Sequence, residues 1–509
     1  MKKNLSACTT VLVGKNATID GSTMAARNDD TFGPLTPQRF VTYPAYHNQP
    51  NQVKAYLNKC VVDRPADGYR YQGTPNVNYK TEGVFDESGF NEKNVGMSAT
   101  ESTYSNERVL AFDPLVEDTG INEDLIVAAT LPFINSAREG VQYLGQLIKK
   151  YGSAEGNGVI FSDKNDVWYM EIITGHHWVA QRIPDDCYAV TGNRIAIQEV
   201  DFNDPDNFMW DDTIREFVAE HHLNPDRDGW NFRHIFGTAT VFDQHYNTPR
   251  QWYGHKVLSP DVEMDPLDFD LPFVMKADHK ITLEDVEEVL SSHYQNTPYD
   301  PLGHGTDEEK HMFRPISLNR TQNSHILQVR PDLPEAASTI MWMSFGIPTF
   351  TPYVPFFGNA ADVDASYKNT PKELNMNLKS AYWMYRALSM IAADVDASYK
   401  NTPKELNMNL KSAYWMYRAL SMIVESHHAE FLQADLDYLK DARQYFYKWI
   451  DETAPLAEGM DNNEASDVLS EKTHEMVAEM AKRTKELMSQ LIMHGLELSK
   501  LTFIMDKNL

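Results

Sequence analysis

Residues 5–15 read Leu-Ser-Ala-Cys-Thr-Thr-Val-Leu-Val-Gly-Lys, so Cys8 stands directly before a β-branched, apolar run that is typical of a buried strand. Cleavage of the Ala7–Cys8 peptide bond would give Cys8 a free α-amine beside its thiol. The reference pKa of such an amine is about 7.7–8.0, low enough for the amine to take the thiol proton near neutral pH. With that bond cut, Cys8 would be a nucleophile that carries its own base and needs no separate histidine, which is a complete catalytic hypothesis from one position.

A second stretch, residues 20–30, reads Asp-Gly-Ser-Thr-Met-Ala-Ala-Arg-Asn-Asp-Asp. Its Asp-Gly pair predicts a tight turn, after which a second strand would return beside the first and bring Arg27 next to Cys8. A guanidinium in that place lowers the pKa of the thiol and supports the thiolate. Asp30 could then accept a hydrogen bond from the new α-amine. The alternative for Arg27 and Asp30 is an ordinary ion pair at the end of a strand.

The remaining chain predicts strands first and helices behind them, which indicates an α+β fold with a helical C-terminal part. The clearest β pattern runs from Gly158 to Asn193, where four apolar runs alternate with turn residues and predict an antiparallel meander of four strands. Further strands are predicted at Gln38–Tyr43, Ala55–Val62, Ile326–Arg330 and Ser338–Phe345. Helices are predicted at Glu123–Leu131, Ala137–Tyr151, Asp211–His222, Leu283–His293, Val424–Ile450 and Ala465–Leu498.

Residues 360–391 recur without a single change as residues 392–423. Working repeat proteins diverge between copies and need about three or more units to build a core. Two identical copies therefore indicate a recent duplication or an assembly artefact, and we expect one copy to be displaced or poorly packed. The predicted organisation is a leader (1–7), a catalytic core (8–359), the duplicated segment (360–423) and a helical part (424–509).

Composition excludes several classes of protein. The 509 residues include 46 basic and 73 acidic side chains, giving a net charge of −27 that repels nucleic acid and anionic membranes. No stretch approaches the ~20 apolar residues of a spanning helix. The three cysteines are odd in number and widely spaced, which favours reduced thiols in the cytoplasm. Metal-ligand spacings and phosphate loops are missing from the sequence, so we expect no metal and no cofactor.

The Cys-Thr-Thr-x-Leu-Val-Gly-Lys motif, followed by Asp-Gly-Ser-Thr and Ala-Arg-Asn-Asp-Asp, resembles the C69 family of bacterial dipeptidases. These are N-terminal-nucleophile hydrolases, more distantly related to penicillin V acylase and choloylglycine hydrolase. Residues 89–96 and 163–193 resemble the hairpin and meander of these proteins, and the likeness covers nearly the whole chain. The resemblance implies a four-layer αββα sandwich, self-cleavage before Cys8, and hydrolysis of dipeptides through a thioester.

The resemblance also implies roles for individual residues. Arg27 and Asp30 match the Arg-Asn-x-Asp pair that flanks the nucleophile, and Asn193 matches an asparagine that stabilises the tetrahedral oxyanion. Arg314 matches, more weakly, a later active-site arginine. Glu101 aligns with an asparagine of the choloylglycine hydrolase pocket, and a carboxylate there would suit the free ammonium of a dipeptide. A turn residue, for Asn193, and a solvated strand-end glutamate, for Glu101, are the structural alternatives.

The predicted function is thus a cytoplasmic cysteine-type dipeptidase that forms a homo-oligomer and binds neither nucleic acid nor membrane. One alternative keeps the fold but hydrolyses a non-peptide amide, as penicillin V acylase or a bile-salt hydrolase does. Another alternative is a non-catalytic helical interaction protein, which would leave the motif around Cys8 without a purpose.

Overall fold

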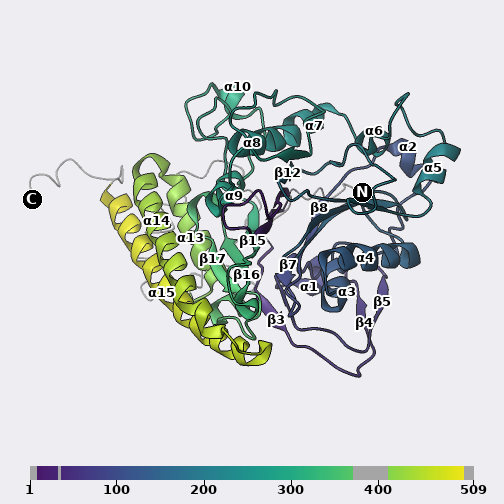
Figure 1. The fold of residues 1–509 in the computed structure, drawn as a ribbon. Coiled ribbons are helices and arrows are strands. Elements are labelled where there is room, and N and C mark those ends of the chain that lie inside the picture. The colour runs from purple at the N-terminus through teal and green to yellow at the C-terminus, as the bar shows by residue number, and fades with distance from the viewer. Residues whose placement is uncertain (1–7, 32–35, 371–410, 498–509) are drawn as a thin grey trace, which may run out of the picture.

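The computed structural model describes residues 8–31, 36–370 and 411–497, and its core is a pair of antiparallel sheets stacked face to face (Figure 1). The sheet that contains β1 has seven strands and is called the nucleophile sheet because β1 follows Cys8, the predicted nucleophile; the second sheet has six strands. In spatial order the nucleophile sheet contains β14 (Val274–Lys276), β12 (Cys187–Thr191), β1 (Thr9–Val13), β2 (Thr23–Asp30), β15 (Thr321–Val329), β16 (Thr339–Phe345) and β17 (Val354–Phe357). The second sheet contains β13 (Phe208–Trp210), β11 (Trp178–Arg182), β10 (Val167–Ile172), β9 (Asn157–Ser162), β8 (Gly96–Ser102) and β7 (Ser88–Phe90).

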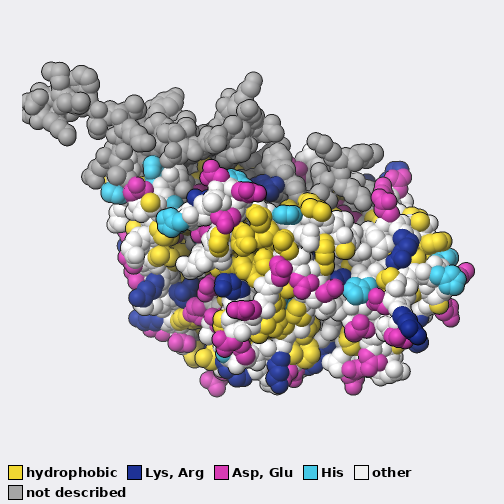
Figure 2. Space-filling view, turned by 90° about the horizontal axis from the view of Figure 1, so that it is seen from above, with side chains coloured by type: hydrophobic (Ala, Val, Ile, Leu, Met, Phe, Trp, Pro, Cys, Tyr) yellow, Lys and Arg dark blue, Asp and Glu magenta, His cyan; other side chains and the backbone are white. Residues whose placement is uncertain are grey.

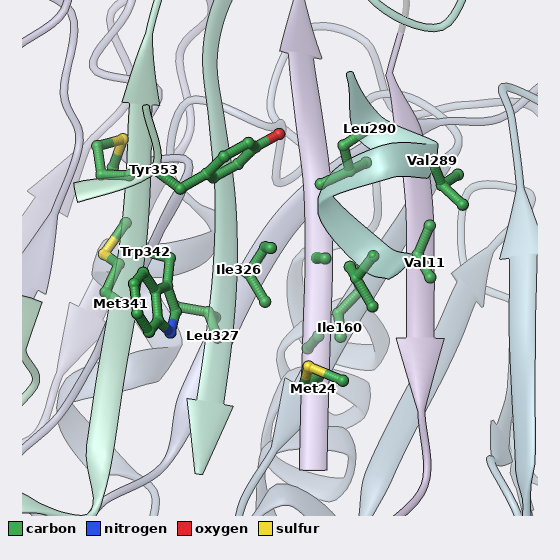
Figure 3. Close-up of a cluster of buried hydrophobic side chains, with 14 of the residues drawn as sticks. Val11, Met24, Ile160, Val289, Leu290, Ile326, Leu327, Met341, Trp342 and Tyr353 are labelled. Atoms are coloured by element: carbon green, nitrogen blue, oxygen red, sulfur yellow. The ribbon is translucent and has the colours of Figure 1, made fainter. Parts of the chain in front are cut away.

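Helices cover the outer face of each sheet. On the second sheet lie α3 (Ile126–Thr130) and α4 (Ala137–Tyr151), and on the nucleophile sheet lie α8 (Thr248–Leu258) and α9 (Leu283–Leu290). Figure 3 shows Val289 and Leu290 of α9 beside Val11 of β1, all three buried in one apolar cluster. The four layers are therefore αββα, which confirms the predicted fold class.

Three long helices complete the nucleophile-sheet side and lie next to one another in Figure 1. They are α13 (Ala413–Ser426), α14 (His428–Thr453) and α15 (Asn462–Glu497), and they pack against β16 and β17. The helix predicted at Val424–Ile450 is in fact two, because the chain leaves helical geometry at His427. The helical C-terminal part is otherwise confirmed.

Short elements connect these layers. Two small hairpins pair β3 (Val41–Tyr43) with β6 (Tyr71–Gly73) and β4 (Asn51–Lys54) with β5 (Val61–Arg64). The remaining helices are α1 (Tyr79–Glu82), α2 (Glu107–Leu110), α5 (Ile214–Glu220), α6 (Phe232–Phe236), α7 (Val241–Tyr246), α10 (Asp307–Lys310) and α11 (Ala365–Lys368), with single 3₁₀ turns at Leu131–Phe133, Glu335–Ala337, Pro348–Phe350 and Ala454–Ala457. The single strand predicted at Ala55–Val62 is wrong, because residues 55–60 turn between β4 and β5.

Local capping explains the most accurate helix prediction. The hydroxyl of Ser136 accepts a hydrogen bond from the backbone N–H of Glu139, and Gly152 closes the helix with a positive φ of 74°. Both signals flank α4 in the sequence, and its bounds, Ala137–Tyr151, are those predicted.

The meander prediction is right for three strands and wrong for the fourth. Strands β9, β10 and β11 are consecutive neighbours in the second sheet, but β12 crosses to the nucleophile sheet and pairs with β1. Each run has the same apolar pattern in either sheet, so periodicity cannot reveal the crossing. The crossing matters because it carries residues 191–193 to the start of β1.

The structure describes only part of the duplicated segment. Residues 360–370 come from the first copy, including α11, and residues 411–423 come from the second copy, where they form most of α13. The other residues of the two copies lie outside the described part of the chain. The displacement of one copy therefore stays a prediction, as does the proposed division into domains.

The distribution of side chains on the surface, and the length and apolar character of the helices, are the features relevant to binding other molecules or a membrane. On the face shown in Figure 2, acidic and basic side chains are interspersed around a central group of hydrophobic side chains. Within the described ranges, no helix is long and apolar enough to cross a membrane.

Candidate active site

Cys8 is buried at the start of β1, between two neighbouring strands. On one side β12 pairs Thr191 with Thr10, and on the other side β2 pairs Asn28 with Thr9. Continued by one step or two, these antiparallel registers set Cys8 between Asn193 and Asp29. The strand that begins one residue after Cys8 is thus held by backbone pairing on both sides.

Arg27 lies against the sulfur of Cys8, as the predicted hairpin requires. Its Nη1 donates a hydrogen bond to Cys8 Sγ at 3.2 Å, and its Nη2 forms an ion pair with the carboxylate of Glu87. Burial lowers the pKa of Arg27, but the negative charges of Glu87, Cys8 and Asp29 raise it by more, so the guanidinium stays charged. A fixed positive charge at this distance favours the thiolate form of Cys8.

A chain of hydrogen bonds holds the guanidinium from behind. Arg27 Nε donates to Ser98 Oγ at 2.9 Å, and Ser98 Oγ lies 2.8 Å from Nε2 of His325. The other ring nitrogen of His325 lies 2.8 Å from Oδ1 of Asn323, so it carries the proton and Nε2 accepts from Ser98. Burial, with the Arg27 charge, holds the pKa of His325 well below its ordinary value, which keeps the ring neutral.

Asn193 contacts the backbone nitrogen of Cys8. The Cys8 N–H donates to Asn193 Oδ1 at 3.1 Å, and Arg250 Nη2 donates to the same oxygen at 2.9 Å. Two donors on one oxygen fix the orientation of the amide, which leaves Nδ2 as the free end. Among the described residues, this buried Nδ2 has no hydrogen-bond acceptor. It is available to a developing oxyanion.

Arg250, like Glu87, Ser98 and His325, is a residue of this site that the sequence does not predict. From α8 it donates to the backbone carbonyl of Cys8 and, at 3.1 Å, to the hydroxyl of Thr9. It approaches so closely because residue 192 is glycine: a Cβ there would lie 2.7 Å from Arg250 Nη2. Its helix was not predicted, and no local motif marks it.

Asp30 and Arg314 form a separate ion pair. Arg314 Nη2 and the hydroxyl of Thr321 both donate to the carboxylate of Asp30, and the opposing charge of Asp30 raises the pKa of Arg314 despite burial. In the described part of the chain, the Cys8 N–H donates to Asn193 and not to Asp30. The α-amine that Asp30 is expected to bind forms only after cleavage, so that role stays a prediction.

The Tyr246 ring joins the two arginine groups. The guanidinium of Arg250 lies 5.0 Å from the ring centroid and that of Arg314 lies 5.3 Å from it. The predicted site residue Arg314 therefore belongs to the same neighbourhood as Cys8, although Arg250 is the one that touches the nucleophile.

Glu101 lies on β8, just after an irregularity in its pairing with β9. Its side chain is outside the described part of the structure, so its proposed contact with substrate stays a prediction. The backbone of β8 does reach the site, since Arg27 Nη2 donates to the carbonyl of Ala99 at 3.0 Å.

The described residues contain no group of three or more His, Cys, Asp or Glu side chains arranged to hold a metal ion. A cavity of about 1150 Å³ lies elsewhere, between α9 and α14, and none of the predicted site residues lines it.

Comparison with known proteins identifies the chain. The model of peptidase family C69 matches residues 7–395, a match that begins one residue before the proposed nucleophile. The chain belongs to peptidase family C69.

Curated relatives of this C69 chain carry related names. A probable dipeptidase of Latilactobacillus sakei is 49% identical over 99% of each chain. Probable dipeptidase B of Lactococcus lactis is 47% identical over 74% of this chain and 79% of its own length. Dipeptidase A of Lactobacillus helveticus is 42% identical over 75% of this chain and 81% of its own length.

A solved structure of a mutant conjugated bile acid hydrolase from Clostridium perfringens is also similar to this C69 chain. The two are 12% identical, with a TM-score of 0.30 over 66% of this chain and 88% of the other. The fold described above rests on its own layers and not on this similarity.

Proposed function

We propose that this protein is a dipeptidase whose nucleophile is Cys8, released as the new N-terminus by self-cleavage of the Ala7–Cys8 bond. Membership of family C69 and the names of the relatives support the substrate class. The observation that carries the mechanism is the position of Cys8, with Arg27 on its sulfur and Asn193 on its nitrogen.

In the maturation step, Sγ of Cys8 attacks the carbonyl carbon of Ala7, and the bond from that carbon to the Cys8 nitrogen breaks. The nitrogen takes up a proton and becomes the α-amine, while residues 1–7 remain attached as a thioester that water then hydrolyses. Arg27 stabilises the thiolate that starts this step.

In the dipeptidase step, the α-amine takes the thiol proton and the thiolate attacks the carbonyl carbon of the peptide bond. Asn193 Nδ2 donates to the oxyanion of the tetrahedral intermediate, where one donor is typically worth ~2.7–4 kcal/mol. The intermediate collapses to a thioester, and the C-terminal amino acid leaves with the proton from the amine. Water then attacks the thioester and releases the N-terminal amino acid.

The other residues of the site would act through these groups. Arg250 fixes the Asn193 amide and the Cys8 carbonyl, and Asp30, held by Arg314, accepts a hydrogen bond from the α-amine. For Glu101, on β8, a contact with the substrate ammonium stays a prediction. We also propose that the enzyme is a cytoplasmic homo-oligomer that needs neither metal nor organic cofactor.

Intact mass of the purified protein tests the proposal most directly. Loss of residues 1–7 from the wild-type chain and retention of the leader in Cys8→Ala are expected. The matured enzyme should hydrolyse Leu-Leu, lose activity with iodoacetamide and keep activity with a chelator.

A substrate panel separates the proposal from its nearest alternative. Hydrolysis of penicillin V or glycocholate in place of every dipeptide tested would assign a non-peptide amidase. Full activity of Cys8→Ala would rule out the nucleophile, and full activity of a chain that keeps its leader would rule out self-cleavage as a requirement.

A further inference from the structure

Asp29 is a buried carboxylate on the nucleophile's own face of the sheet. Continued by one step beyond the pair of Thr9 and Asn28, the register of β1 and β2 makes Asp29 the cross-strand neighbour of Cys8. The register of β2 and β15 pairs Asp29 with Asn323. Cross-strand neighbours of this kind have Cβ atoms about 4.5–5.5 Å apart, with side chains on the same face. The side chain of Asp29 therefore lies on the same face of the sheet as the sulfur of Cys8.

Neutral amides hold one oxygen of this carboxylate. Oδ2 of Asp29 accepts hydrogen bonds from Gln38 at 2.6 Å, Asn323 at 3.3 Å and Gln322 at 3.4 Å. No hydrogen bond to Oδ1, and no ion pair to Asp29, occurs within the described ranges. The carboxylate is therefore fixed in place, with one oxygen left to accept from something else.

The negative charges at and around Asp29 are not fully balanced by nearby positive charges. Arg27 is the nearby cation, but its guanidinium already forms an ion pair with Glu87 and contacts the Cys8 sulfur. With both carboxylates ionised, Arg27, Glu87 and Asp29 together carry one negative charge in excess. Burial raises the pKa of Asp29 although Arg27 and the amides lower it, so a further cation would stabilise the ionised form.

A second polar group near Asp29 also lacks a partner. The hydroxyl of Tyr414, on α13, is buried and has no hydrogen-bond partner among the described residues. Burial raises the pKa of Tyr414 to about 12, although the charge of Arg418 lowers it, and the charge of Asp29 raises it further. Its ring packs against Phe345, the residue paired with Asn323.

We propose that Asp29 binds the α-ammonium of the substrate's first residue, with its free Oδ1 as acceptor. In a dipeptide this ammonium is carried by the carbon next to the carbonyl that Cys8 attacks, so its binder must stand beside the sulfur. This inference rests on the proposed dipeptidase function and assigns the anchor to Asp29 and not to Glu101.

The test compares substrates that differ only in this ammonium. Wild-type enzyme, Asp29→Asn and Asp29→Glu are assayed on Leu-Leu and on N-acetyl-Leu-Leu, with Glu101→Gln as the matched comparison. Asp29→Asn keeps an oxygen for the three amides but removes the charge. The Asp29→Asn variant should have a kcat/KM for Leu-Leu about 30-fold or more below that of wild type, mainly because KM rises. Its kcat/KM for N-acetyl-Leu-Leu should stay within about 3-fold of the wild-type value. Asp29→Glu should recover part of the loss.

Other outcomes are decisive as well. Equal losses on both substrates would give Asp29 a purely structural role and overturn the inference, as would a loss of selectivity in Glu101→Gln with none in Asp29→Asn. If Asp29→Asn does not fold, wild-type enzyme supplies the test: equal kcat/KM values for the free and acetylated dipeptides would also overturn it. Failure of wild-type enzyme on every dipeptide would instead refute the proposed function.

Discussion

Arg27 Nη1 donates a hydrogen bond to Sγ of Cys8 over 3.2 Å, while Nη2 of the same guanidinium is bound to Glu87. One buried side chain therefore connects the nucleophile of β1 to a carboxylate 60 residues away in sequence from that arginine. Since Arg27 has fixed partners on both ends, its charge stays beside the sulfur whether or not substrate is present.

Replacing Arg27 by Gln should raise the pKa of the Cys8 thiol and slow its alkylation by iodoacetamide at pH 7 about tenfold, because the thiolate loses its nearest positive charge. The rate of alkylation against pH measures this shift. Arg227→Gln, at an exposed position, serves as the control and should follow the wild-type profile. An unchanged profile in Arg27→Gln would remove Arg27 from nucleophile activation.

Replacing Asn193 by Ala removes the amide whose buried Nδ2 has no hydrogen-bond partner among the described residues. We expect kcat for dipeptides to fall about 10²–10³-fold with a small change in KM, because the donor acts on the oxyanion and not on the ground state. Asn193→Asp keeps the acceptor for the Cys8 nitrogen but lacks the donor, so its kcat should fall as far. Recovery of kcat in the aspartate variant would show that the acceptor, and not the donor, is what matters.

Gly192→Ala tests the approach of Arg250 to the site. A Cβ at this position would lie 2.7 Å from Nη2 and 2.8 Å from Cζ of Arg250, so the guanidinium must move away from Asn193 and from the Cys8 carbonyl. Slower self-cleavage, followed by intact mass over time, is the expected result. Gly459→Ala, whose neighbourhood is open, is a control for the general effect of adding a methyl group, though its positive φ adds local strain. Wild-type cleavage in Gly192→Ala would make Arg250 dispensable.

The parts of the site that could be predicted from the sequence are those set by local pairing. The apolar run after Cys8 predicts β1, and β2 returns beside it as predicted, with Thr10 opposite Arg27, which brings the guanidinium to the sulfur. The tight turn predicted at Asp20-Gly21 is wrong, because residues 14–22 connect the two strands and this register does not centre on Asp20 and Gly21.

The parts that could not be predicted depend on contacts between distant segments. Glu87, Ser98 and His325 meet Arg27 only because the two sheets stack, and Arg250 reaches Cys8 across 242 residues of sequence. Asn193 was found through the family resemblance, while its position depends on a strand that leaves one sheet for the other. The spacing of apolar residues indicates that a segment is buried, but it does not indicate which other segment packs against it.

The last prediction concerns stability and the C-terminal helices. Asp435 on α14 is fully buried, neither carboxylate oxygen has a hydrogen-bond partner within the described residues, and burial raises its pKa to about 8. The folded state therefore holds the proton more tightly than the unfolded chain, so the stability from this group is greatest at low pH and is lost as pH rises towards 8. Between pH 5 and pH 8 the loss is about 4 kcal/mol at most. Asp435→Asn cannot ionise and should unfold at a higher temperature than wild type at pH 8, with the difference shrinking at pH 5. Asp437→Asn, at an exposed position on the same helix, is the control. Parallel melting curves for wild type and Asp435→Asn across this range would show that the carboxyl group is not titrating in the folded state.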